Sequence, residues 1–253
     1  MTDKKPALEG GFRTTDEQLV GARLREAFER SPDPFEKRID NFPKYIRRQA
    51  LTKSLAQYEI FKRVQHVKGS IVECGVLRGG SLFTWFHLSS ILEPVNFTRR
   101  IYGFDTFAGF PSVAAQDQAP SSQHVSAGGL QSDCYEELLE LVRVHDSNRL
   151  LNHIDKVHLV RGDAAKTIPA FVETHPHLVV SLLYLDFDLY EPTCAAIDHF
   201  VPRMPKGAII AFDELDNPLW PGETRAALDK LGLNRLRIER LDFDPYIGFA
   251  TIE

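Results

Sequence analysis

Residues 70–81 read SIVECGVLRGGS, a short apolar run followed by a turn that contains three glycines. The run has the length and composition of a buried β-strand, and Leu82, Trp85 and Phe86 follow it with the spacing of a helix. Glycines at a strand-to-helix turn allow the main chain to approach a bound ligand closely, at the edge where open α/β sheets bind cofactors. We therefore interpret residues 70–81 as the start of an α/β domain with a cofactor site.

Six further strand-like segments follow, most of them alternating with helical patterns. Continuous apolar strands separated by helices indicate a parallel sheet that is covered on both faces. The last two strands form a pair, which indicates one reversed strand at an edge. We predict the α/β class, with a doubly wound, mostly parallel, seven-stranded Rossmann-like sheet. Its expected strands are residues 70–76, 100–104, 157–161, 179–185, 208–212, 236–241 and 247–252.

The domain organisation follows from where this alternation begins. Residues 1–54 are helical but weakly periodic, and we predict an N-terminal helical arm that covers the active site or contacts a second subunit. Residues 55–253 form the predicted cofactor-binding domain. Residues 111–131 are long, polar and rich in Gly and Ser, which is typical of a functional loop, here a lid.

Composition and charge limit the classes of partner. The 253 residues carry a net charge of −5 and show no dense Lys/Arg cluster, so we expect a small-molecule partner and no nucleic acid. No apolar run is long enough for a membrane span, and the N-terminus lacks the apolar core of a signal peptide. Three cysteines without Cys-x-x-Cys spacing argue against disulfides and against a cysteine zinc site. We expect a cytoplasmic enzyme.

The cofactor candidates end three successive strands. The spacing Glu73-x-Gly75-x-x-x-Gly79 differs from the dinucleotide pattern, which disfavours a nicotinamide cofactor. Asp105 is placed to accept both ribose hydroxyls of an adenosine-type ligand. Asp163 is placed to accept from an adenine amino group, or alternatively to cap the next helix. The candidate cofactor-binding residues are Glu73, Gly75, Gly79, Ser81, Asp105 and Asp163.

Four acids end the fourth and fifth expected strands. Asp186 and Asp188 follow one strand, and Asp213 and Glu214 follow its neighbour, so up to four carboxylates meet. Such crowding is costly unless a cation is present or protons are shared. Oxygen ligands favour Mg²⁺, Mn²⁺ or Ca²⁺ over zinc. Asp186 and Asp188 are two residues apart and are expected to share a face. The alternative is a set of solvated acids and helix caps.

At this point the sequence resembles the macrocin and novobiocin-sugar O-methyltransferase family of class I methyltransferases. The matching segments are residues 41–48 (NFPKYIRR), 69–76 (GSIVECGV), 103–107 (GFDTF), 185–193 (LDFDLYEPT) and 213–214 (DE).

The resemblance implies S-adenosylmethionine as cofactor, a lid, and Mg²⁺ (or Mn²⁺) bound by Asp186, Asp213 and Glu214, with Asp188 as general base. Two positions depart from the family pattern. Glu214 replaces a frequent Asp and loosens the metal geometry, and Phe187 replaces a small residue and alters the acceptor site.

The predicted function is S-adenosylmethionine- and Mg²⁺-dependent methylation of a sugar hydroxyl, on a nucleotide-linked deoxyhexose or a glycosylated natural product. A catechol-type O-methyltransferase and a non-catalytic cofactor-binding homologue are the alternatives. His124 is a second candidate catalytic residue, or an exposed loop histidine. Trp220 stacks on a sugar or packs in the core, and Glu223 joins the acceptor site or merely starts a helix. We also expect a homo-oligomer.

Overall fold

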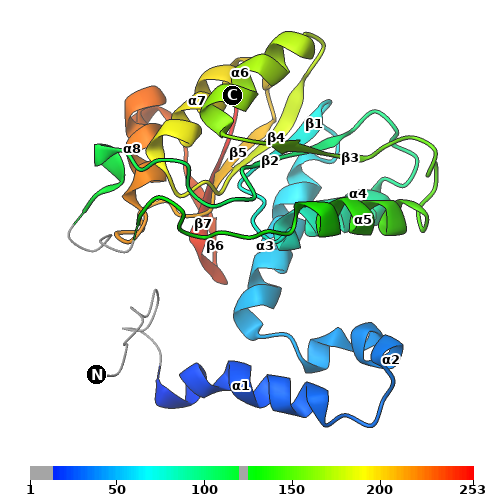
Figure 1. Cartoon of the computed structure of the whole chain (residues 1–253). Helices are drawn as coiled ribbons and strands as arrows, with labels where there is room; N and C mark the ends of the chain where they lie inside the picture. The colour runs from blue at the N-terminus through cyan, green and yellow to red at the C-terminus, as the bar shows by residue number, and fades with distance from the viewer. Residues whose placement is uncertain (1–13, 120–124) are drawn as a thin grey trace. The chain divides into compact units, whose positions relative to one another are not determined.

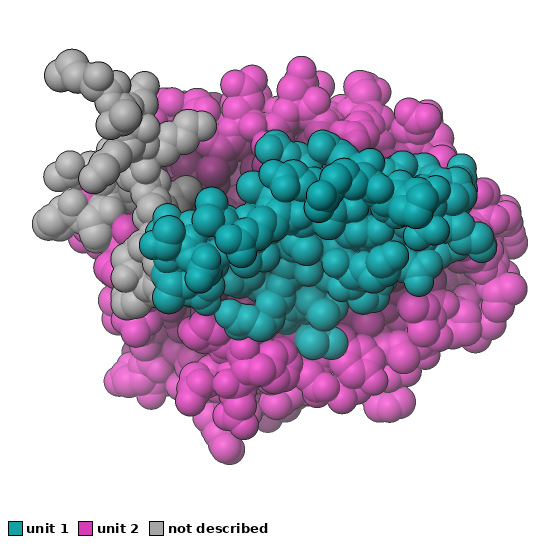
Figure 2. Space-filling model, turned by 90° about the horizontal axis from the view of Figure 1, so that it is seen from below, with its two compact units in different colours: residues 1–55 teal, residues 56–253 magenta. Residues whose placement is uncertain are grey.

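The computed structural model describes residues 14–119 and 125–253. The chain divides into two compact units, Met1–Leu55 and Ala56–Glu253, which Figure 2 colours separately. The predicted arm ends at residue 54, one residue before this division.

The first unit consists of short helices with little buried surface. Its elements are α1 (Thr15–Glu29), α2 (Phe35–Asp40), the 3₁₀ helix η2 (Phe42–Lys44) and the beginning of α3 (Arg48–Val64). Helix α1 starts with a capping box, in which the Thr14 side chain accepts from the Glu17 main chain and Glu17 accepts from Thr14. Phe28 packs edge-on against Tyr45, with a centroid distance of 4.9 Å. No residue of α1 or α2 is buried.

The second unit is built on a seven-stranded sheet in the order β3-β2-β1-β4-β5-β7-β6 (Figure 1). Strands β1 to β5 pair in parallel, and β7 runs antiparallel to both β5 and β6. The predicted α/β class and mostly parallel seven-stranded sheet are confirmed. The strands are β1 (Ser70–Cys74), β2 (Ile101–Asp105), β3 (Val157–Arg161), β4 (Val180–Leu185), β5 (Ile209–Phe212), β6 (Glu239–Leu241) and β7 (Asp244–Thr251).

The sequence predicted that the reversed strand lies at the edge of the sheet, and this was wrong. The reversed strand is β7, which lies between β5 and the edge strand β6. Only residues 242 and 243 separate β6 from β7, so these two strands form a hairpin. The longer and more buried β7 pairs with β5, which leaves the short β6 as the outer strand.

Helices cover both faces of the sheet, because successive side chains of a strand point to opposite faces. On one face, Ile71 belongs to a core cluster with side chains of α3, α4 and α5. On the other face, Val72 and Cys74 belong to a cluster with α6, α7 and α8. The remaining helices are α4 (Gly80–Leu92), α5 (Tyr135–Asp146), α6 (Ala164–Thr174), α7 (Tyr190–Phe200), α8 (Pro221–Lys230), and the 3₁₀ helices η3 (Ala115–Asp117), η4 (Val201–Arg203) and η5 (Leu233–Arg235).

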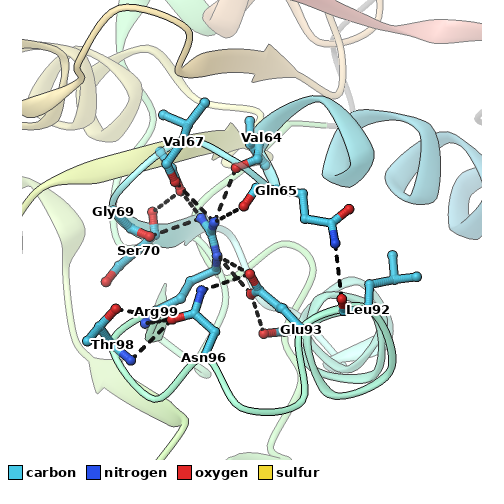
Figure 3. Close-up of polar contacts among 12 residues, drawn as sticks. Val64, Gln65, Val67, Gly69, Ser70, Leu92, Glu93, Asn96, Thr98 and Arg99 are labelled. Atoms are coloured by element: carbon cyan, nitrogen blue, oxygen red, sulfur yellow. Dashed lines mark hydrogen bonds and ion pairs between the residues drawn. The ribbon is translucent and has the colours of Figure 1, made fainter.

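A buried arginine organises the end of the sheet where the parallel strands begin (Figure 3). Arg99 is 2% exposed and forms an ion pair with Glu93, with 2.8 Å between the two charged atoms. Its guanidinium also donates to main-chain carbonyls that connect α3 with β1. These carbonyls belong to Val64, Gln65, Val67 and Gly69.

No helix in the described part of the chain has the length and apolarity of a membrane span.

Candidate active site

The turn after β1 touches the chain that leaves β4. The Asp186 amide donates to the Cys74 carbonyl at 2.7 Å. Gly75 has φ +100°, and a Cβ added there would stand 1.9 Å from the Asp186 carbonyl oxygen. Glycine is therefore required for the contact between these two strand ends, a role beyond the close approach of a ligand that the sequence predicted.

The other residues of this turn lie at the start of α4. Gly79 has a left-handed backbone, with φ +79°, and is the N-cap residue of the helix. Ser81 accepts a hydrogen bond at 2.5 Å from the side-chain amide of the buried Gln57. Glu73 is fully buried within β1, beside Tyr184 of β4 in the sheet register.

Asp105 ends β2, as predicted, and its carboxylate holds the glycine-rich turn. One oxygen accepts from the amides of Val76 and Leu77, both at 2.8 Å. The other accepts from the amide of Phe107 at 2.7 Å. A carboxylate offers about four acceptor positions, so three bonds leave room for one of the two predicted ribose hydroxyls. The contact with a ribose stays a prediction.

Asp163 is the N-cap residue of α6, which is the alternative considered from the sequence. Its side chain accepts from the Ala165 amide at 3.1 Å and forms an ion pair with Lys166 at 3.0 Å. The adenine contact stays a prediction as well.

The acids after β4 and β5 lie on neighbouring strands. Asp188 and Asp213 are each 9% exposed, and the hydroxyl of Tyr184 donates to Asp213. The Asp213 amide donates to the Leu185 carbonyl at 2.9 Å, which continues the pairing of the two strands one residue past the end of β5. Asp188 has φ +63°, so the argument that Asp186 and Asp188 share a face of a regular strand was wrong: β4 ends at Leu185.

Glu223 is a fully buried carboxyl in the first turn of α8. It accepts from the amide of Asp188 at 3.4 Å and from the amide of Glu214 at 3.1 Å. Burial, and then the negative charges of Asp188, Asp186 and Asp213, raise the pKa of Glu223 well above its usual value. From the sequence, Glu223 was recognisable only as an acid near a helix start, after the acid pair 213–214. Acids at helix starts are usually exposed to solvent.

The predicted metal ligands are of a suitable chemical type, but the structure does not arrange them around a common point. Carboxylate oxygens are the ligands that Mg²⁺ prefers. Within residues 14–119 and 125–253, no group of three or more His, Cys, Asp or Glu side chains is arranged to hold an ion. The identity of the donors therefore fits a cation, and the predicted ligands Asp186, Asp213 and Glu214 stay predictions.

The described parts of the 111–131 loop are attached to the starts of α7 and α8. Asp117 is 2% exposed and accepts from the Tyr190 amide at 2.7 Å. Arg225 donates to the Gln116 carbonyl at 2.5 Å. Val125 forms a small apolar cluster with Leu189 and Trp220, so Trp220 takes the core-packing alternative. His124 lies outside the described residues.

Comparison with known proteins identifies the family. The sequence model described as Macrocin-O-methyltransferase (TylF) matches residues 47–246. The chain belongs to the TylF family of macrocin O-methyltransferases. This membership confirms the family, the class I methyltransferase fold and the enzyme class predicted from the sequence.

Individual relatives agree with this membership. An enzyme of Streptomyces olivaceus, 8-demethyl-8-(2,3-dimethoxy-alpha-L-rhamnosyl)-tetracenomycin-C 4'-O-methyltransferase, is 31% identical over 152 residues. That match covers 58% of this chain and 53% of the relative, about half the relative's length.

Solved structures match over most of the chain. CalS11, described as a calicheamicin methyltransferase, is 35% identical with a TM-score of 0.89, over 94% of this chain and 93% of CalS11. The apo structure of CalS11, described as a TDP-rhamnose 3'-O-methyltransferase, is 34% identical with a TM-score of 0.82. This match covers 94% of this chain and 95% of that chain. The O-methyltransferase NovP shares the fold at 20% identity and a TM-score of 0.64, over 92% and 96%.

Proposed function

We propose that the protein transfers a methyl group from S-adenosylmethionine to a hydroxyl of a deoxyhexose. The observation that carries this proposal is the contact between the turn after β1, where the cofactor is expected, and Asp186, the first acid after β4. The methyl donor and the acids that would serve the acceptor thus belong to one edge of the sheet. The names of the S. olivaceus enzyme and of CalS11, which both mention a rhamnose, favour a sugar acceptor.

The cofactor would be held by the turn after β1 and the two acids beside it. S-adenosylmethionine supplies an electrophilic methyl group at its sulfonium. Gly75 and Gly79 lie in the turn, Ser81 lies at the start of α4, and Glu73 is buried in β1. Asp105 would accept from the ribose while it holds the turn, and Asp163 would accept from the adenine.

A divalent cation, Mg²⁺ or Mn²⁺, would bind to Asp186, Asp213 and Glu214. When bound, it would stabilise the negative charge that develops on the acceptor oxygen. A cation held by these three carboxylates would favour an acceptor with vicinal hydroxyls.

Asp188 would act as the general base. It takes the proton of the sugar hydroxyl as the oxygen forms its bond to the methyl carbon and the carbon–sulfur bond breaks. The products are the methyl ether, S-adenosylhomocysteine and one proton on Asp188, which is then lost to water. Asp188 is 9% exposed, so little solvent reaches this residue.

Product formation with different acceptors tests the proposal. The protein is incubated with S-adenosylmethionine and either a nucleotide-linked deoxyhexose or a catechol, with Mg²⁺ or excess EDTA, and released S-adenosylhomocysteine is measured. We expect release with the deoxyhexose, its loss in EDTA, and calorimetric cofactor binding that persists in EDTA. Release with the catechol alone would contradict the sugar assignment, and full activity in EDTA would contradict the cation.

Three further expectations belong to the same proposal. A homo-oligomer, a cytoplasmic location and the absence of a nucleic-acid partner stay predictions. Gel filtration with light scattering measures the first of them directly.

A further inference from the structure

Glu223 connects the two acidic strand ends. One carboxyl oxygen accepts from the amide of Asp188, after β4, and the other accepts from the amide of Glu214, after β5, at 3.4 and 3.1 Å. The side chain is 0% exposed, so water does not compete for these amides. The last main-chain hydrogen bond between the two strand ends joins the Asp213 amide to the Leu185 carbonyl. Glu223 binds the two chains directly after it.

The start of α8 packs against the main chain that carries Asp188. A Cβ added at Gly222 would stand 2.6 Å from the Asp188 carbonyl oxygen and 2.7 Å from the Tyr190 nitrogen. It would also stand 2.4 Å from a carboxylate oxygen of Asp117, which accepts from the same Tyr190 amide. Residues 188–190 are therefore held between α8 and η3, and Glu223 is the next residue of α8 after Gly222.

We propose that Glu223 is a positioning residue that fixes the general base Asp188 relative to Glu214. This rests on the proposed function, in which Asp188 is the general base and Glu214 binds the cation. Glu223 would set the distance between these two residues. Its carboxyl group acts through two main-chain amides and does not itself reach the substrate. An error of about 1 Å in the position of a catalytic group costs roughly 100-fold in rate, so this spacing has a measurable effect.

The test compares Glu223→Gln and Glu223→Ala with a matched control. In Glu223→Gln the shape is kept, but the amide nitrogen cannot accept, so one of the two main-chain donors loses its partner. Asp244→Ala is the control, because Asp244 is also buried and accepts from two main-chain amides, those of Tyr246 and Ile247, through one carboxylate oxygen. The readouts are kcat, the KM for S-adenosylmethionine, thermal unfolding and amide hydrogen exchange without ligands.

We expect kcat to fall about 10-fold or more in Glu223→Gln and further in Glu223→Ala, with an unchanged cofactor KM. The amides of Asp188 and Glu214 should exchange faster, while those within β4 and β5 stay protected. Asp244→Ala should lower stability without this loss of kcat. If Glu223→Ala does not fold, Glu223→Gln decides the question.

Two results would overturn the proposal: wild-type kcat with unchanged exchange at both amides, or a loss of kcat and stability equal to that in Asp244→Ala. Failure of the proposed function would look different. In that case the wild-type protein would methylate no sugar, while the exchange experiment would still report whether Glu223 holds the two amides.

Discussion

Asp188 combines a left-handed main chain, with φ +63°, and a carboxylate that is 9% exposed. Non-glycine residues rarely adopt this conformation, and Asp and Asn tolerate it best. A strained position of this kind persists when its surroundings fix it, here by the contacts with Glu223 and the start of α8. The strain fits a residue whose direction is important for chemistry.

Asp188→Asn should therefore fold normally and lose catalysis. Asparagine keeps the shape and suits the left-handed backbone, but it cannot accept the proton, so turnover should fall by about two to four orders of magnitude. Kinetics and thermal unfolding measure the two effects. Cation affinity should change less than in Asp186→Asn. Near-normal turnover would place the base elsewhere, with His124 as the next candidate.

Gly75→Ala should disturb both the turn after β1, where the cofactor is expected, and the main chain at Asp186, the first acid after β4. The added Cβ would stand 1.9 Å from the Asp186 carbonyl oxygen, and main-chain atoms cannot rotate away as a side chain can. The left-handed φ alone costs about 1–3 kcal/mol of unfolding free energy. We expect weaker S-adenosylmethionine binding and lower turnover.

Gly21→Ala is the control for Gly75→Ala, because Gly21 lies in α1 and nothing stands within 4 Å of its added Cβ. It should leave activity intact and stabilise the helix by up to about 1 kcal/mol. Equal cofactor affinity in Gly75→Ala and the wild type would contradict the contact between the two strand ends.

At the scale of elements, strands with continuous apolar runs were predictable from the sequence. Residues 179–185 predict β4 almost to the residue, because a strand buried on both faces is apolar along most of its length, with Ser181 as the exception here. Residues 236–241 gave a strand that is too long, because η5 (Leu233–Arg235) precedes it and pairing with β7 begins only at Glu239.

Parts of the site were not predictable for reasons of chemistry. Glu223 has the sequence pattern of a solvated helix start, and only the three-dimensional arrangement shows that it is fully buried between two acidic turns. Asp105 was predictable as a strand-end acid, but its three main-chain donors depend on how the turn after β1 curls back. Neither contact has a periodic signature.

Arg99→Ala should show how much the network in Figure 3 contributes to stability. Removing the guanidinium leaves Glu93 buried without this ion pair and removes the donor to several carbonyls, so we expect a loss of about 3–5 kcal/mol in unfolding free energy. Urea denaturation measures it. Arg63→Ala is the control, because the pair of Arg63 with Glu239 is partly exposed and is worth about 1 kcal/mol or less. Equal losses would contradict the assigned role of Arg99.

At the scale of the whole molecule, stability should depend on pH through Lys156. Its side chain is 4% exposed and donates to the Asn96 carbonyl at 2.9 Å, and burial lowers its pKa from 10.5 to about 8. Between these values the unfolded chain keeps a proton that the folded chain has lost. The contribution of Lys156 to stability therefore rises as the pH rises through this window.

Urea denaturation of the wild type and of Lys156→Met, at about pH 7 and about pH 10, measures this contribution. The difference between the two proteins removes the effect of other titrating groups. The wild type should gain stability relative to the variant at the higher pH. A constant difference would show that Lys156 titrates alike in the folded and unfolded chains.

The central claim is that this chain methylates a sugar hydroxyl at the edge where β1, β4 and β5 end. Its most direct test is incubation of the protein with Mg²⁺, a nucleotide-linked deoxyhexose and S-adenosylmethionine carrying an isotopically labelled methyl group, followed by mass spectrometry and NMR of the sugar. We predict the gain of one labelled methyl group on a hydroxyl oxygen of the sugar, and its absence with Asp188→Asn. An unlabelled sugar, under conditions where calorimetry shows bound cofactor, would contradict the account.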